Sequence, residues 1–347
     1  AEAPTSQQFA RAATVVDEHL LKIASPQPKG GVTWNGDTDV IFGAAGTGLY
    51  LLYASEMATR ANDTVLSDRL LSMASEAGKW LITQAISSHG GLTWTVGALL
   101  PDYEAPNFSH GTAGISYFLA TLHRATGDRR SLDTALAGAR FLSAIANKTG
   151  DGFLVFHDNS TVGQGVFYLG WCGGPPGTAR LFWRLWQVTG DVNHLKAVRG
   201  GLMSIRESHI PTTFTSGFWN NVGQCCGNAG VSELFAHMAS AAHPHLPDPS
   251  ALLSFAHEMA ANAAQRARRV RTAAGPGLEW PDAENNDHRK VLTVQTGVSH
   301  PPHTFATCRS DARCRSDTCG GGIEVEGTCD GQSLRGVKVD RCRVHAM

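Results

Sequence analysis

Residues 109–128 read SHGTAGISYFLATLHRATGD and contain a glycine pair, an apolar run, and a later glycine followed by aspartate. The run from Ile115 to Leu122 is apolar on nearly every side, which is typical of a buried helix. Gly127 suits the left-handed position just after a helix, and Asp128 suits the N-cap of the next helix. We therefore predict a buried helix, a tight loop and a second helix with one polar face.

The same pattern recurs along the chain, which indicates a repeat architecture. A Gly-apolar-x-aromatic element, or a close variant of it, returns roughly every sixty residues, beginning at Gly31, Gly91, Gly152, Gly217 and Gly277. A Gly-x-x-Gly pair follows each of the first four copies, with its first glycine at Gly43, Gly111, Gly174 or Gly227. Because the first helix of each pair is apolar nearly all round, we predict an all-α fold: an α/α toroid in which outer helices cover a ring of inner ones. An open helical solenoid is the alternative.

The pattern divides the chain into residues 1–297, which we expect to form the toroid, and residues 298–347, an irregular cysteine-rich tail. Val298–His300 echoes the start of an earlier repeat, but Pro301 stands where the glycine belongs, and apolar periodicity then ends. The tail holds Cys308, Cys314, Cys319, Cys329 and Cys342. We favour a shifted reading frame or a replaced terminus over a natural tail with its own disulfides or metal. In either case the last inner helix is expected to be absent.

The composition argues against nucleic acids and membranes as binding partners. The chain has 29 Lys+Arg and 30 Asp+Glu without a long basic run, so neither a nucleic-acid surface nor an anionic-membrane surface is indicated. Its most apolar stretch, residues 40–55, is too short and too rich in glycine to predict a membrane span. The start Ala1-Glu2-Ala3-Pro4 is consistent with a processed N-terminus and export, whereas a thiolate site suits a reducing compartment.

Chemistry-bearing residues occupy equivalent positions just before the glycine pairs. His110 and Cys226 directly precede the first glycine of their pairs, and Cys172 and Cys225 stand one residue further back. Because equivalent loops of a ring face the same opening, we expect these four side chains to converge. Thiolates favour zinc, and three protein ligands with one open position are typical of catalytic zinc. A single cysteine here would be better interpreted as a small buried side chain, but three favour a metal.

Four motifs in this order resemble those of the lanthionine synthetase C-like proteins. Residues 170–177 (GWCGGPPG) resemble the family's Trp-Cys-x-Gly-x-Pro-Gly motif, and residues 225–230 (CCGNAG) resemble its Cys-His-Gly-x-Ala-Gly motif in a Cys-Cys-Gly variant. Residues 109–114 (SHGTAG) resemble its His-Gly-x-x-Gly motif, and residues 39–43 (DVIFG) its Asp-Val-x-x-Gly motif. Each motif alone is a weak signal, but the ordered set across roughly residues 30–297 is specific.

The resemblance implies an α/α toroid with one Zn²⁺ ion, in a family that is mostly cytoplasmic. It implies Cys172, Cys225 and Cys226 as metal ligands, with Cys226 in place of a histidine. It also implies His110 as general acid/base and places Asp39 in the same active site. The implied activity is that of a cyclase: zinc-dependent addition of a thiol to dehydroamino acids, forming lanthionine-type thioethers. The expected partner is a dehydrated peptide or a small thiol such as glutathione.

That chemistry is coherent for these residues. A zinc-bound thiol loses its proton and adds to the β-carbon of a dehydroamino acid. His110 is the type of residue that can protonate the α-carbon of the resulting enolate. Asp39 would orient the imidazole or hold it protonated. A third thiolate ligand is expected to make the bound substrate thiolate more nucleophilic.

Departures from the family pattern keep two other functions open. The family often has an arginine shortly before the Trp-Cys motif, whereas Tyr168 stands four residues before Cys172 and no lysine or arginine lies between Asp151 and Ala179. A non-catalytic family member that binds peptide or metal is one alternative. The other is a carbohydrate-active α/α toroid, a hydrolase or epimerase, which would need paired carboxylates in the pore. The candidate carboxylates are Asp39, Asp102, Glu104 and Glu284.

Overall fold

The computed structural model describes residues 6–148, 150–161, 163–213, 221–272, 275–281, 330–334 and 337–341. Within these residues, α1 (Ser6–Ile23) precedes a series of helix pairs. Strands β7 (Asp330–Leu334) and β8 (Val337–Arg341) pair as an antiparallel hairpin within the predicted tail. The motif echo at 298–300 and the tail cysteines lie outside the described residues.

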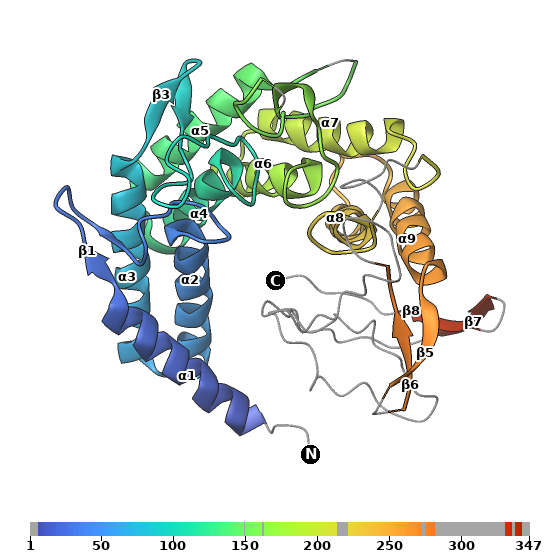
Figure 1. Cartoon of the computed structure of the whole chain (residues 1–347), viewed down its shortest axis with the longest axis horizontal. Helices are drawn as coiled ribbons and strands as arrows, with labels where there is room; N and C mark the ends of the chain where they lie inside the picture. Colours follow the sequence, from blue (N-terminus) through green and yellow to red (C-terminus); the bar gives the residue numbers. More distant parts are fainter. Residues whose placement is uncertain are drawn as a thin grey trace.

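The helix pairs form two layers. The pairs are α2 (Ala44–Arg60) with α3 (Thr64–Thr83), α4 (Thr112–Thr126) with α5 (Arg129–Ile145), α6 (Pro175–Thr189) with α7 (Asn193–Glu207), and α8 (Asn228–Ala241) with α9 (Pro249–Gln265). Each even-numbered helix packs against its own partner, and α2 contacts α4, α4 contacts α6, and α6 contacts α8. Figure 1 shows the even-numbered helices on the inside of the arc and their partners outside. This arrangement confirms the predicted α/α toroid.

Each inner helix begins directly after the first glycine of its pair, as predicted. Gly43, Gly111, Gly174 and Gly227 are the N-cap residues of α2, α4, α6 and α8. The need for glycine is clearest at Gly111, where an added Cβ would lie 1.6 Å from the carbonyl oxygen of Ala105. The preceding loop therefore packs backbone against backbone onto the start of the helix.

Short hairpins lie before the first helix pair, between the first two pairs and after the last pair, each directly before one of the recurring tryptophans. They are β1 (Ser25–Pro26) with β2 (Val32–Thr33), β3 (Ile86–Ser88) with β4 (Gly91–Thr93), and β5 (Arg268–Thr272) with β6 (Gly275–Glu279). The indole N–H groups of Trp34, Trp94 and Trp280 donate to the carbonyl oxygens of Leu20, Leu81 and Ala263, at 2.8–2.9 Å. Each accepting carbonyl lies in the last turn of the preceding helix, where carbonyls lack helical partners. The element beginning at Gly217 lies outside the described residues.

The predicted helix–helix turns have glycine in the left-handed region. Gly127 has φ +76° and ends α4, and the Asp128 carboxylate caps α5 by accepting from the backbone N–H groups of Arg130 and Ser131. The second turn differs in detail: Asp191 accepts from the backbone N–H of Asn193 at 2.9 Å, and α7 begins one residue later than an Asp191 N-cap would place it. Polar capping still occurs in both turns.

Gly127→Ala is expected to lower the free energy of unfolding by about 1 kcal/mol. Nothing lies within 4 Å of the added Cβ, so the loss comes from the left-handed backbone alone. Urea unfolding monitored by circular dichroism would measure it. Gly165→Ala is the matched control, because its added Cβ also meets open space and its φ lies outside the left-handed region. Equal losses in the two variants would contradict this account.

None of the helices in the described part of the chain is long and apolar enough to cross a lipid bilayer.

Candidate metal centre and acid–base pair

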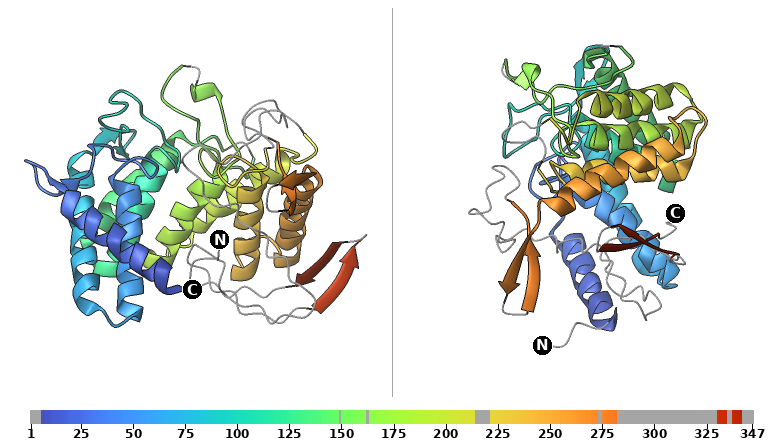
Figure 2. Two further views of the ribbon diagram at one scale, coloured as in Figure 1. Left: turned by 60° about the horizontal axis from the view of Figure 1, so that its bottom comes forward. Right: turned by 90° about the vertical axis from the view of Figure 1, so that its right-hand side faces the viewer.

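The loops that precede the inner helices are hydrogen bonded to one another in succession. The backbone N–H of Val40 donates to the carbonyl oxygen of Ser109 at 3.1 Å, and the backbone N–H of Ser109 donates to the carbonyl oxygen of Cys172 at 3.1 Å. The N–H of Cys172 then donates to the carbonyl oxygen of Cys225 at 3.0 Å. These loops lie on the same side of the helical layers (Figure 2, left). Residues far apart in sequence are thereby brought to one end of the inner helices.

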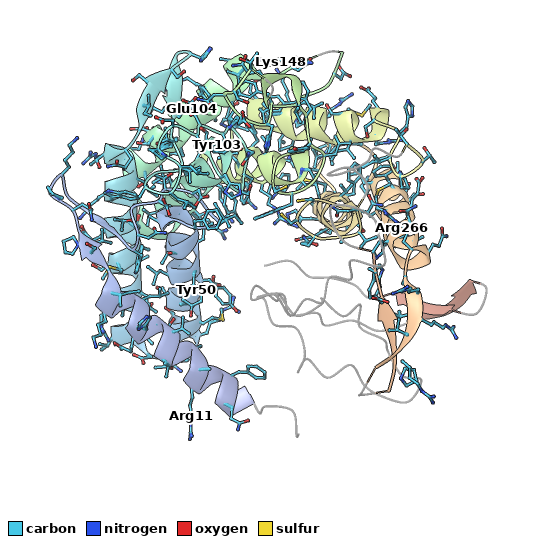
Figure 3. All side chains as sticks on the ribbon, in the orientation of Figure 1. Arg11, Tyr50, Tyr103, Glu104, Lys148 and Arg266 are labelled. Carbon is cyan, nitrogen blue, oxygen red and sulfur yellow. The ribbon has the colours of Figure 1, made fainter. Side chains whose placement is uncertain are left out.

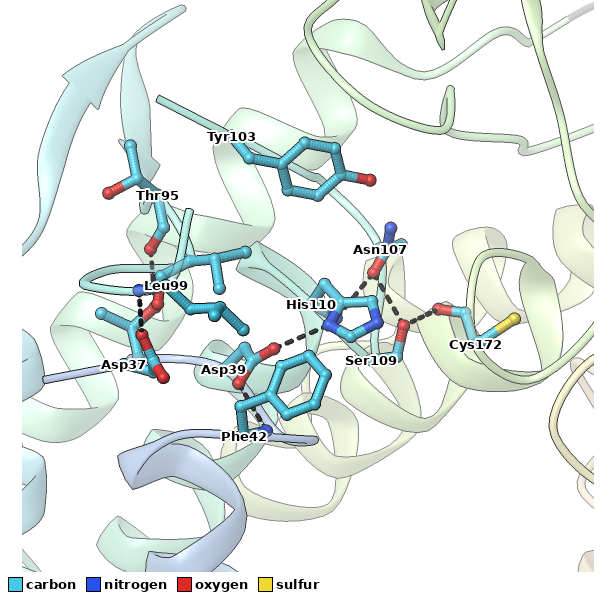
Figure 4. A network of polar contacts seen from close by, with 12 residues as sticks. Asp37, Asp39, Phe42, Thr95, Leu99, Tyr103, Asn107, Ser109, His110 and Cys172 are labelled. Atoms are coloured by element: carbon cyan, nitrogen blue, oxygen red, sulfur yellow. Dashed lines mark hydrogen bonds and ion pairs between the residues drawn. The ribbon is translucent and has the colours of Figure 1, made fainter. Parts of the chain in front are cut away.

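Asp39 and His110 form a directly bonded pair. The imidazole Nδ1 lies 2.7 Å from Asp39 Oδ2, and Asp39 Oδ1 accepts the backbone N–H of Phe42 at 2.8 Å. The Phe42 ring stacks on the imidazole with centroids 5.4 Å apart (Figure 4). Asp39 is completely buried, whereas the His110 side chain is 31% exposed. The carboxylate therefore orients the ring, and Nε2 is the ring nitrogen that lies outside this bond.

Asn107 holds the histidine loop, a role that the repeat pattern did not indicate. Its side-chain oxygen accepts the backbone N–H of His110 at 2.8 Å and the Ser109 hydroxyl at 3.2 Å. The same hydroxyl lies 3.1 Å from the carbonyl oxygen of Cys172 (Figure 4). Because Asn107 is 1% exposed, these bonds are shielded from water. The loop of the acid–base pair is thus fixed to the loop of the first cysteine.

Three cysteine side chains meet on the next two loops. The Sγ atom of Cys226 lies 3.1 Å from that of Cys172 and 3.4 Å from that of Cys225, and all three atoms lie within 4.8 Å of one another. Sulfurs bound to one tetrahedral zinc at about 2.3 Å would be roughly 3.8 Å apart. Cys172 and Cys226 are half-buried and Cys225 is exposed, so the cluster opens to solvent on one side. The three cysteines could hold a metal ion.

The surroundings of Cys172 oppose a negative charge unless a cation is near. Hydrogen bonding with Cys225 first, then with Cys226, and then burial raise the pKa of the Cys172 thiol far above its ordinary value. A divalent cation inverts this relation, because a coordinating thiol is deprotonated outright. The chemistry of this donor set therefore fits a metal cation better than it fits a free thiolate.

Two tyrosines and a histidine lie beside the site, and the buried Asp158 carboxylate is 3.6 Å from Nε2 of that histidine. The ring centroids of His157 and Tyr168 are 4.5 Å apart, and the Tyr103 hydroxyl lies 3.5 Å from His157 Nε2. Burial is the main cause that raises the pKa of Tyr103 to about 12. Tyr103 is labelled in Figures 3 and 4. Sequence reasoning noticed Tyr168 only as a departure from the family pattern and missed the other two, because neither occupies an equivalent repeat position.

His157 is expected to make the folded state less stable in acid. Burial lowers the pKa of His157 below its ordinary value of 6.5. The Asp158 carboxylate opposes this lowering, and the His110 imidazole adds to it by a smaller amount. Below about pH 6.5 the unfolded chain therefore binds a proton that the folded chain resists, with a limiting slope of about 1.4 kcal/mol per pH unit. Urea unfolding between pH 7.5 and 5.5 should show a shallower decline for His157→Gln than for the wild type. Parallel declines would contradict this assignment.

The four carboxylates that a carbohydrate-active site would draw on have different surroundings in the structure. Asp39 is bonded to His110, and Asp102 is exposed. The backbone of Glu104 is hydrogen bonded to Asn159 through its carbonyl oxygen, at 2.9 Å. Glu284 lies outside the described residues. Of the three described carboxylates, the fully buried one, Asp39, is therefore partnered by an imidazole.

Comparisons with known proteins agree with the sequence motifs. The family model described as lanthionine synthetase C-like protein matches residues 5–266. No curated protein matches the chain in sequence.

The fold also occurs in solved structures. A GH76 alpha-mannanase from Bacteroides thetaiotaomicron matches at 13% identity and a TM-score of 0.52, over 82% of this chain and 73% of that one. A family 76 glycoside hydrolase from a bovine Bacteroides thetaiotaomicron strain matches at 13% identity and a TM-score of 0.55, over 80% of this chain and 61% of that one, less than two thirds of its length. At such identities the likeness concerns the fold alone.

Proposed function

The chain belongs to the lanthionine synthetase C-like family, and from this premise we propose that it catalyses zinc-dependent addition of a thiol to dehydroamino acids. The observation that carries the proposal is the cluster of Cys172, Cys225 and Cys226 on loops bonded to the loop of His110, which Asp39 orients. A metal-activated thiol and a proton donor are the two groups that this addition needs.

Cys172, Cys225 and Cys226 would hold the zinc ion. When bound, zinc would supply the acidity that converts a substrate thiol to its thiolate near neutral pH. With three cysteine ligands, the substrate thiol is expected to have a pKa below its value in solution. Titration of thiol consumption against pH would measure this, and an unshifted value would count against the ligand set.

His110 and Asp39 would complete the reaction at the α-carbon. The thiolate forms the C–S bond at the β-carbon, and the π electrons move onto the α-carbon and its carbonyl. Nε2 of a protonated His110 then donates a proton to the α-carbon, and the proton released by the substrate thiol restores the imidazolium. Asp39, 2.7 Å from Nδ1, fixes the direction of the ring so that Nε2 faces away from the carboxylate.

The two tyrosines would take the place of the arginine that the family often has. The raised pKa of Tyr103 keeps its hydroxyl protonated near neutral pH, and Tyr168 supplies a second phenol hydroxyl. We propose that they bind the substrate carbonyl oxygen, on which negative charge develops during the addition.

The test uses the full chain, elemental analysis and a dehydroalanine-containing peptide. We expect about one zinc per chain and loss of the thiol of a cysteine in the same peptide, detected by alkylation and mass spectrometry. Glutathione with a cysteine-free peptide tests the small-thiol version. A well-folded chain without zinc would overturn the mechanism. Zinc without turnover would favour the non-catalytic alternative, and release of reducing sugar from an α-mannan would favour the carbohydrate alternative.

A further inference from the structure

Large apolar side chains are exposed at the mouth of the candidate site. Ile41, Phe42, Leu99 and Leu100 are 46%, 48%, 56% and 46% exposed, and we call these four residues the apolar rim. They lie on two loops, one just before α2 and one between β4 and α4. Grouped apolar exposure beside a polar site is typical of a ligand-binding surface.

The two loops of the apolar rim are held together by buried polar bonds. Asp37, 4% exposed, accepts the backbone N–H of Leu99 at 2.7 Å and the side-chain amide of Asn35 at 2.8 Å. The same amide donates to the carbonyl oxygen of Phe42 at 2.9 Å. Figure 4 shows Leu99 and Phe42 on the Asp39 side of His110. The rim is therefore a positioned surface, because its backbone is fixed while its side chains face outward.

The apolar rim is continuous with the acid–base pair. The Phe42 ring stacks on His110 at 5.4 Å, and the backbone N–H of Ile41 donates to the carbonyl oxygen of Ser109 at 3.3 Å. A ligand side chain that rests on Phe42 is thus one aromatic ring away from the imidazole. Contact with the rim would determine which part of a substrate reaches Nε2 of His110.

We propose that the apolar rim binds an apolar side chain of a peptide substrate, next to the residue that undergoes addition. This proposal rests on the proposed function and narrows its substrate class to peptides in which an apolar residue flanks the dehydroamino acid. In the small-thiol version glutathione supplies only the thiol, so in both versions the rim would contact the peptide that carries the dehydroamino acid. Burial of apolar surface from both partners favours the peptide.

The experiment measures binding without chemistry. Two fluorescent peptides carry alanine in place of dehydroalanine and differ only in the flanking residues, which are leucine in one and serine in the other. Fluorescence anisotropy gives their Kd values for the wild type, for the double variant Leu99→Ser/Leu100→Ser, and for the control Leu253→Ser. Leu253 is 43% exposed on the outer helix α9 and is therefore matched in burial.

We expect the wild type and the control to bind the leucine peptide roughly tenfold or more tightly than the serine peptide, and the double variant to lose this preference. The bond from the Leu99 backbone to Asp37 does not involve the substituted side chain, so the fold should persist; circular dichroism checks it. Equal or undetectable binding of both peptides by the wild type would overturn the proposal. So would a preference that survives in the double variant.

The outcome is separable from the proposed reaction, because the peptides cannot react. A chain that prefers the leucine peptide but never consumes a thiol with the dehydroalanine version would leave the rim assignment intact and overturn the activity. A chain that turns over both dehydroalanine peptides equally, without a binding preference, would overturn the rim assignment and leave the proposed activity intact.

Discussion

Cys172→Ala is expected to abolish the proposed zinc binding and thiol addition together, while the helices stay folded. Its Sγ atom lies 3.1 Å from that of Cys226, so the substitution deletes one of three adjacent donors. A structural zinc site with four ligands binds with about 10–16 kcal/mol, so losing one ligand should weaken binding by roughly a hundredfold or more. The backbone bonds of residue 172 to Ser109 and Cys225 do not need the thiol and should persist.

Elemental analysis after dialysis against a weak chelator would measure the zinc loss, and a thermal melt would check the fold. His110→Ala is the control for this variant, because it changes a neighbouring loop without deleting a sulfur and should keep its zinc. A Cys172→Ala chain that retains zinc at the level of the wild type would remove these cysteines from the mechanism.

His110→Ala should lower the rate of thiol addition by about 10²–10⁴, with zinc content unchanged. The reason is that the α-carbon then lacks a positioned proton donor. Added imidazole should restore part of the rate in His110→Ala, because a small diffusible acid can occupy the vacated space. A structural role alone would show no such rescue, so turnover with and without imidazole is the deciding measurement.

Asp39→Asn tests whether the Asp39 carboxylate is needed to orient the His110 ring, because the substitution keeps the size and packing of the side chain. The amide oxygen can still accept the backbone N–H of Phe42, but an uncharged group then faces Nδ1 of His110. We expect a rate loss of roughly tenfold to a thousandfold, smaller than that of His110→Ala, because the donor remains but an amide holds its ring less firmly than a carboxylate does. Full activity in this variant would exclude Asp39 from proton transfer.

Much of the helical framework was predictable because helix ends depend on residues close in sequence. Gly111 begins α4 and Gly127 ends it in the left-handed region, as the glycine pattern predicts. The prediction that Asp191 is the N-cap of α7 was off by one residue. The N-cap is Val192, although the Asp191 carboxylate still accepts the backbone N–H of Asn193. Such local choices shift an element boundary by one residue and leave the layer arrangement unchanged.

Repeat equivalence also predicted which loops would converge. His110 and the three cysteines stand before the first glycine of their pairs, and consecutive inner helices start side by side. The meeting of the three cysteines, and the backbone bonds that join their loops to the loop of His110, follow from placing equivalent helix starts around one axis. The resemblance to a known family added the zinc and the reaction, which remain proposals for this chain.

The sequence by itself determined the helix pairs, the glycine starts and the set of candidate ligands, since these follow from local backbone preferences and periodicity. The family resemblance had already led us to expect that Asp39 orients His110. Only the tertiary structure gave the contacts themselves: the bond between His110 and Asp39, 71 positions apart, the meeting of Tyr103 with His157, 54 apart, and the bond that holds Leu99 to Asp37, 62 apart. The physical reason is that these contacts depend on how each loop packs onto the start of a neighbouring inner helix, which no local pattern specifies.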